Sequence, residues 1–125
     1  MISVEVQNRS GSNFDEEEAI AFARGLLVAE GIDEGELGLQ LVSPEEMRGL
    51  KRDHLGRDEE GDVLSFPIDG REPLPEGVPR LLGDAVLCPQ VVGAEWRRPL
   101  AHGLLHLLGY EHGDEMSARE AELTA

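Results

Sequence analysis

The chain has 125 residues, enough for one domain with a hydrophobic core and too few for two. Its formal net charge of −15, from 26 acidic and 11 basic residues, disfavours long-range attraction to nucleic acid. A single cysteine, Cys88, excludes an intramolecular disulfide, and no apolar stretch is long enough to span a bilayer. The first ten residues also lack the pattern of a signal peptide, so we expect a cytoplasmic protein without membrane contact.

In the first half of the chain, the hydrophobic pattern predicts two strands and two helices. Apolar and polar residues alternate over 2–6, as in a half-buried strand. An acidic first turn and a glycine stop predict a helix over 15–31. A second alternating run at 37–41 predicts a strand, and a capping box with proline at the first helical position predicts a short helix over 43–51.

The second half of the chain predicts further strands, loops and helices. They are, in order, a loop at 56–62, a strand at 63–66, a loop at 69–79, a strand at 82–92, a helix at 99–109 and a last helix from about residue 114. We expect the longest helix to follow the last strand. This order is typical of a single α+β domain with a small mixed β-sheet and packed helices.

Three of the four histidines lie close together in the sequence HGLLHLLGYEH. His102 and His106 are four residues apart on the predicted penultimate helix, so both rings project from one face. Gly109 is placed to end that helix, and the turn after it can return His112 toward the other two. Three protein ligands with one open position are typical of a catalytic zinc site. We therefore predict that His102, His106 and His112 bind one Zn²⁺ or another divalent transition metal.

The same spacing occurs in metzincin proteases, but one position differs. In that pattern a glutamate follows the first histidine and acts as general base, whereas this chain has Gly103 there. The metal site is therefore predicted and the protease activity is not. The alternative is that the three histidines are ordinary surface or core residues of a leucine-rich helix, and their ligand spacing disfavours it.

Three other residues are expected to be structural. His54 is isolated in a charged segment, and Cys88, which precedes a proline near the end of a predicted strand, is expected to lie in the core. Trp96 is expected to pack at the base of the histidine helix rather than to stack on a nucleobase.

Three segments in the same order resemble the YbeY family of bacterial endoribonucleases. They are the histidine segment at 102–112, DVLSFP at 62–67 and GDAVLCP at 83–89, within a similarity that covers roughly residues 40–116. The resemblance implies a mixed sheet with packed helices and a zinc-like ion held by the three histidines. It also implies cleavage of single-stranded RNA, processing near the 3′ end of small-subunit rRNA, and a role in ribosome quality control.

The chain departs from the family pattern in the segment before the DVLSFP motif. An arginine that the family places there aligns with Leu55, and a tyrosine aligns with His54. An arginine at the site could hold a phosphate, and Arg52 or Arg57 are candidates to replace it. The family's aspartate before the third histidine is Glu111 here. The general base of the reaction is not identified from the sequence.

Several charged residues near these motifs have two interpretations. Glu111, or Asp84 from the neighbouring strand, could orient a water molecule at the metal, and Asp84 could equally have a turn or capping role. Arg97 and Arg98, just before the histidine helix, could supply local positive charge or form a solvated helix start.

Three functions follow from these observations. The first is a metal-dependent endoribonuclease acting on an rRNA precursor. The second is a non-catalytic, metal-stabilised ribosome-assembly module, because an acidic surface suits the basic proteins of the small ribosomal subunit. The third is a metal-dependent hydrolase of another substrate, which Gly103 disfavours for peptides.

Overall fold

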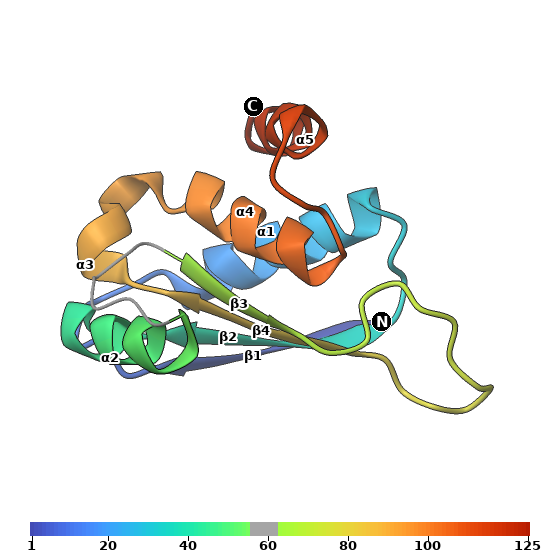
Figure 1. The fold of residues 1–125 in the computed structure, drawn as a ribbon, viewed down its shortest axis with the longest axis horizontal. Coiled ribbons are helices and arrows are strands. Elements are labelled where there is room, and N and C mark those ends of the chain that lie inside the picture. Colours follow the sequence, from blue (N-terminus) through green and yellow to red (C-terminus); the bar gives the residue numbers. More distant parts are fainter. Residues whose placement is uncertain (56–62) are drawn as a thin grey trace.

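A four-stranded mixed sheet forms the centre of the computed structural model, which describes residues 1–55 and 63–125 (Figure 1). Its strands are β1 (Ile2–Asn8), β2 (Gly35–Leu41), β3 (Val63–Pro67) and β4 (Leu81–Leu87). They lie in the order β1-β2-β4-β3. The β1–β2 and β2–β4 pairs are parallel, and β3 is antiparallel to β4. The predicted α+β class and mixed sheet are confirmed.

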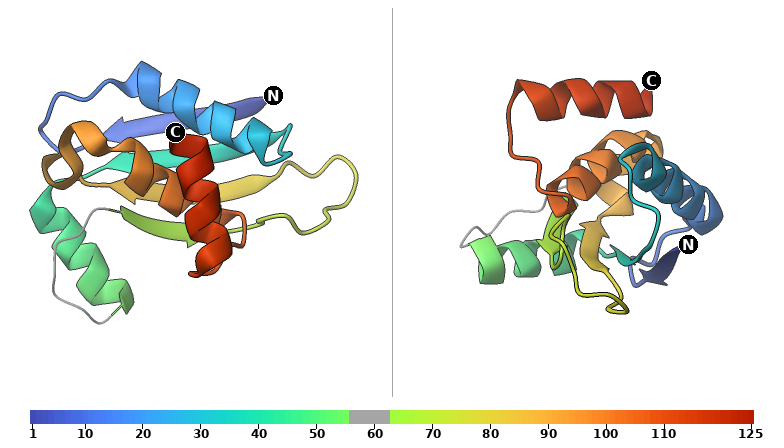
Figure 2. Two further views of the ribbon diagram at one scale, coloured as in Figure 1. Left: turned by 90° about the horizontal axis from the view of Figure 1, so that it is seen from above. Right: turned by 90° about the vertical axis from the view of Figure 1, so that its right-hand side faces the viewer.

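The helices form layers on the two faces of this sheet. They are α1 (Glu16–Ala29), α2 (Pro44–Leu55), α3 (Pro89–Val92), a short 3-10 helix (Gly93–Glu95), α4 (Arg97–Leu107) and α5 (Asp114–Thr124). Helices α1 and α4 cover one face, and α5 lies outside them across α4 (Figure 2). Helix α2 lies at one end of the other face.

The main core lies between the sheet and helices α1 and α4. It is rich in leucine, because the alternating side chains of β2 and one face of α4 meet there. Trp96 is 6% exposed and packs edge-on against Phe14 and Phe22 at the start of α4, as predicted. A smaller cluster under α2 contains Cys88, which is fully buried, so its predicted core position is also confirmed.

The other strands and the loop at 69–79 lie where the pattern predicts them. The predicted loop at 56–62 lies outside the described residues. Within the described part of the chain, no helix has the length and hydropathy needed to cross a membrane.

The last strand is shorter than the apolar pattern predicts. We expected a strand over 82–92, but β4 ends at Leu87, and α3 begins at Pro89. Proline has no N–H to donate to the sheet, and its fixed φ suits the first turn of a helix. Cys88 and Pro89 therefore end the strand, and the prediction for 88–92 was wrong.

The lengths of the helices also differ from the prediction. Helix α2 extends to Leu55 rather than ending near Lys51, and α4 begins at Arg97 rather than at Pro99. Among the described helices, α1 is the longest with 14 residues, whereas α4 and α5 have 11 each. The expectation that the longest helix follows the last strand was wrong, because Gly109, with a φ of +97°, divides the C-terminal segment.

The buried carboxylate of Glu30 attaches helix α5 to the end of α1. Its side chain is 3% exposed and accepts hydrogen bonds from Arg71 Nη2 at 2.6 Å and Arg119 Nε at 2.5 Å. Arg119 Nη2 also donates to the carbonyl of Ala29 at 3.1 Å. Burial alone would raise the pKa of Glu30, but hydrogen bonds from Arg119 and Tyr110 outweigh it, and the pKa lies below its usual value.

This lowered pKa predicts a pH-dependent contribution to stability. Because the folded-state pKa of Glu30 lies below its unfolded value of about 4.3, the stabilisation is present above that pH and is lost as the pH falls through the folded value. At pH 7, Glu30→Gln should lower the free energy of unfolding by about 2 kcal/mol, since two guanidinium groups lose their charged acceptor. The difference from wild type should shrink below about pH 4 in thermal unfolding measurements.

The exposed residue Glu34 provides the control. Glu34→Gln should leave the melting temperature nearly unchanged both at pH 7 and below about pH 4. An equal loss of stability in Glu34→Gln, or a Glu30→Gln defect that does not change with pH, would contradict this account.

Candidate metal centre

Helix α4 presents His102 and His106 on the side of the sheet where β3 forms the edge. The backbone of α4 approaches β3 closely at Gly103, where an added Cβ would lie 2.7 Å from Val63 Cγ2. Ser65 Oγ also donates a hydrogen bond of 2.9 Å to the carbonyl of Gly103. These contacts fix the height and rotation of α4, and therefore the direction of both imidazoles.

The turn after α4 brings the third histidine to the other two. Gly109, in the left-handed region of φ, reverses the chain, and His112 returns toward the end of the helix. The Nε2 atoms of His102 and His106 are 3.1 Å apart. The Nε2 atom of His112 is 3.1 Å from that of His102 and 2.9 Å from that of His106. The structure thus brings together the three histidines that the sequence analysis selected.

Two of these imidazoles have their tautomers fixed by hydrogen bonds. His102 Nδ1 is 2.6 Å from Glu120 Oε1, and His106 Nδ1 is 2.9 Å from the carbonyl oxygen of Tyr110. Because carboxylates and carbonyls accept hydrogen bonds, both Nδ1 atoms carry a proton, so the neutral tautomer that fits these contacts has its lone pair on Nε2. Burial lowers the pKa of His106, and although the hydrogen bond to Tyr110 opposes this shift, the net direction is downward. This shift favours the neutral form of the ring, which is the form that binds a metal ion.

This arrangement fits a metal ion. Lone pairs that point at one another repel, and a cation between them removes that repulsion. Nitrogens bound at 2.0–2.1 Å to a tetrahedral ion lie roughly 3.3 Å apart, close to the 2.9–3.1 Å separations of the Nε2 atoms. A set of three imidazoles suits zinc and other divalent transition metals rather than magnesium or calcium. The three histidines could therefore hold such an ion.

The histidines border a cavity of about 640 Å³. Its other lining residues are Val63, Leu64, Ser65, Pro67, Arg98, Pro99 and Glu120. The wall formed by β3 is mainly apolar, whereas Arg98 and Glu120 place opposite charges at the side of His102. Glu120 and Arg98 therefore join the histidines as candidate functional residues.

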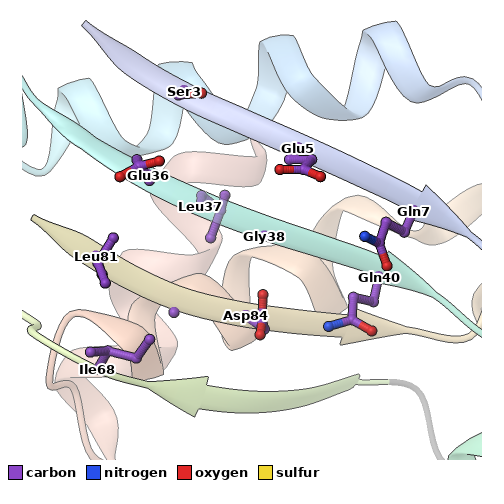
Figure 3. Close-up of a pocket in the computed structure, with 11 residues that line it drawn as sticks. Ser3, Glu5, Gln7, Glu36, Leu37, Gly38, Gln40, Ile68, Leu81 and Asp84 are labelled. Carbon is purple, nitrogen blue, oxygen red and sulfur yellow. The ribbon is translucent and has the colours of Figure 1, made fainter.

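Asp84 lies on the wrong face of the sheet to orient water at this centre. Its neighbour on β4, Ala85, packs toward Gly103 of α4, so the side chain of Asp84 points away from that helix. The side chain of Asp84 lies against Gly38 of β2 and lines a polar groove with Glu5 (Figure 3). Asp84 is also inside β4, so its predicted turn or capping role was wrong too.

The remaining sequence candidates lie in different places. Glu111 is exposed and lines a separate hollow beside the turn, which His112 also borders. Arg52 is exposed on α2 and is not among the described residues that line the histidine cavity. Arg57 lies outside the described residues. His54 contacts the ring of Phe66 and does not join the other histidines, as expected.

Sequence reasoning missed Glu120 entirely. It follows His102 by 18 residues and comes from a different helix, α5, so no local spacing connects the two. Its side chain is 9% exposed, although it is charged. The one feature that could have indicated Glu120 is that it is nearly buried although charged. That burial is known only once the packing of the amphipathic helix α5 is known.

A comparison with protein-family models identifies a match over nearly the whole chain. The model described as "Endoribonuclease YbeY" matches residues 5–124. The chain belongs to the YbeY family. Among curated proteins, "Endoribonuclease YbeY" of Halorhodospira halophila is 41% identical over 99 residues, which cover 70% of this chain and 64% of that protein. The protein of the same name from Alcanivorax borkumensis is 38% identical over 116 residues, 83% of this chain and 66% of that protein.

The chain thus spans slightly less than two thirds of these two YbeY proteins. A solved structure supports the fold over a larger share. The solution structure of a protein from Thermotoga maritima is similar, with a TM-score of 0.57 and 25% sequence identity. The similarity covers 98% of this chain and 86% of that protein. The family and the fold therefore agree with the resemblance seen in the three sequence segments.

The hydrogen bond from His102 to Glu120 predicts an effect on metal affinity. Acceptors that orient metal-binding histidines typically contribute 10–100-fold to affinity, because they hold the ring and increase its basicity. Glu120→Gln should therefore weaken zinc binding by about tenfold, measured by competition with a chromophoric chelator. Its circular dichroism spectrum should stay that of the wild type.

Glu122, on the same helix, is the matched control. Its side chain is 66% exposed, and its Oε2 atom is 3.8 Å from Nη1 of Arg119. Glu122→Gln should bind zinc as tightly as the wild type. Equal zinc affinities for Glu120→Gln and the wild type would show that Glu120 does not support the centre.

Proposed function

We propose that this YbeY family member is a metal-dependent endoribonuclease that cleaves single-stranded RNA, with one zinc ion held by His102, His106 and His112. The observation that carries the proposal is the convergence of three Nε2 atoms within 3.1 Å of one another. The name shared by the family model and the relatives supports the choice of RNA as substrate. Three protein ligands leave a position for substrate or water, as catalytic zinc sites do.

The residues around the site have separable roles in this proposal. When bound, the ion supplies Lewis acidity toward a phosphoryl oxygen and lowers the pKa of an attacking hydroxyl or water. Glu120 and the carbonyl of Tyr110 hold His102 and His106 in the tautomer that presents Nε2. In this proposal the RNA occupies the cavity of about 640 Å³ that the histidines border. Glu111 remains our candidate for orienting water from the side of His112.

We further propose that the biological substrate is an rRNA precursor, processed near the 3′ end of the small-subunit rRNA in the cytoplasm. Membership of the YbeY family and the resemblance of the three sequence segments support this choice of substrate. The net charge of −15 favours contacts with the basic proteins of the small ribosomal subunit rather than a broad grip on RNA. The same charge is the observation that favours the second candidate, a metal-stabilised assembly module without catalysis.

A peptidase is disfavoured by the packing at position 103. The glutamate that the metzincin pattern requires there would need a Cβ 2.7 Å from Val63 Cγ2 and 3.3 Å from Ser65 Oγ. Neither a general base nor space for one is present at this position. Hydrolysis of peptides should therefore be absent.

The proposal predicts that cleavage depends on the metal centre. Purified protein should cut a single-stranded RNA, lose the activity on treatment with a chelator, and regain it when zinc is restored. His106→Ala should lower the rate by at least 100-fold, because it removes one of three ligands (about 2.7 kcal/mol of barrier). Gel analysis of a labelled oligoribonucleotide measures these rates.

His54→Ala is the matched control, since this fourth histidine lies on α2 and contacts Phe66. It should cleave RNA at the wild-type rate. Undiminished cleavage by His106→Ala would identify a contaminating nuclease and contradict the proposal. Metal-bound protein that associates with small-subunit precursors but never cleaves RNA would support the assembly module instead.

A further inference from the structure

Two consecutive arginines at the start of α4 have different surroundings. Arg97 forms an ion pair with Glu18 of α1, and its guanidinium carbon lies 4.4 Å from the centre of the Trp96 ring. Glu18 and Trp96 both lie where α4 packs on α1. Arg97 is therefore engaged in a structural contact that joins the two helices.

Arg98 lies on the other side, at the metal centre. It lines the same cavity as the three histidines. Its Nε atom is 3.6 Å from Oε2 of Glu120, and the other oxygen of that carboxylate bonds to Nδ1 of His102 at 2.6 Å. One nearly buried carboxylate thus holds both a guanidinium group and a metal-site histidine. Within residues 1–55 and 63–125, this ion pair is the single polar interaction of the Arg98 side chain.

We propose that Arg98 binds a phosphate of the RNA strand next to the scissile bond. The inference rests on the proposed function and adds the residue that holds the substrate. Arg98 is the only permanently charged cation among the described residues that line the cavity. A guanidinium group donates two parallel hydrogen bonds to phosphate oxygens, and the apolar wall formed by Val63 and Pro67 offers a phosphate nothing comparable.

The ion pair with Glu120 leaves Arg98 available to a ligand. At 3.6 Å, and with 53% of the Arg98 side chain exposed, the pair is solvent-screened and weak. Glu120 keeps its hydrogen bond with His102 when the guanidinium turns toward phosphate. The net charge of −15 repels a polyanion at long range, but this repulsion does not prevent a single local cation such as Arg98 from contacting a phosphate.

The test measures RNA binding separately from cleavage. The probe is a fluorescent single-stranded oligonucleotide with every ribose 2′-O-methylated, titrated into zinc-loaded protein at several salt concentrations. Arg98→Ala should raise the Kd by about tenfold and lower the slope of log Kd against log salt by about 0.7, the effect of one lost phosphate contact. Arg98→Lys should recover part of the affinity. Arg97→Ala, which removes an identical charge one residue away, should bind like the wild type.

Each alternative gives a different result. Equal weakening by Arg97→Ala and Arg98→Ala would assign the effect to general charge and overturn the inference. A loss of zinc affinity in Arg98→Ala would show that the arginine acts through Glu120 on His102, and this also overturns it. Wild-type affinity in Arg98→Ala overturns the inference and leaves the proposed nuclease intact, whereas wild-type protein that neither binds nor cleaves RNA overturns both. Arg98→Gln replaces Arg98→Ala if the alanine variant does not fold.

Discussion

The close contact between α4 and β3 at Gly103 is the constraint on which the site depends. With no side chain at this position, the helix backbone approaches Val63 and accepts a hydrogen bond from Ser65. The rotation of α4 is fixed by this contact, so the residues on either side of Gly103 project in set directions, His102 among them. The same contact removes the space in which a metzincin-like base would stand. One packing requirement therefore both sets the direction of His102 and leaves no space for a glutamate at position 103.

Helix α5 contributes a hydrogen-bond acceptor to the histidine cluster. The tautomer of His106 is fixed locally by the carbonyl of Tyr110, but that of His102 depends on Glu120, which α5 brings across α4. The position of α5 is set in turn by Arg119, the neighbour of Glu120, through its bond to the buried carboxylate of Glu30. Two glutamates, one at each end of this chain of contacts, thus couple the docking of the last helix to the geometry of the histidines.

The sequence predicts those parts of the site that local geometry determines. The spacing of His102 and His106 and the turn at Gly109 depend only on helix periodicity and on the φ of glycine. Glu120 could not be found, because its role depends on how two helices cross. Asp84 was misplaced because apolar residues surround it on both sides in LLGDAVL, and the register shift near Leu37 hides which face each side chain takes.

The net charge of −15 describes long-range fields, which decay over about 8 Å at physiological ionic strength, and it does not describe the contacts available at one site. What matters at a site is the partner of each charge. Arg97 and Arg98 are identical in type and adjacent in sequence, yet one is held between α1 and Trp96 and the other faces the histidine cavity. Consecutive side chains on a helix point about 100° apart. One arginine can therefore form a structural contact while the next faces a position open to a substrate. An acidic chain can therefore act on a polyanion through a few contacts, provided the fold turns the right cation toward the site.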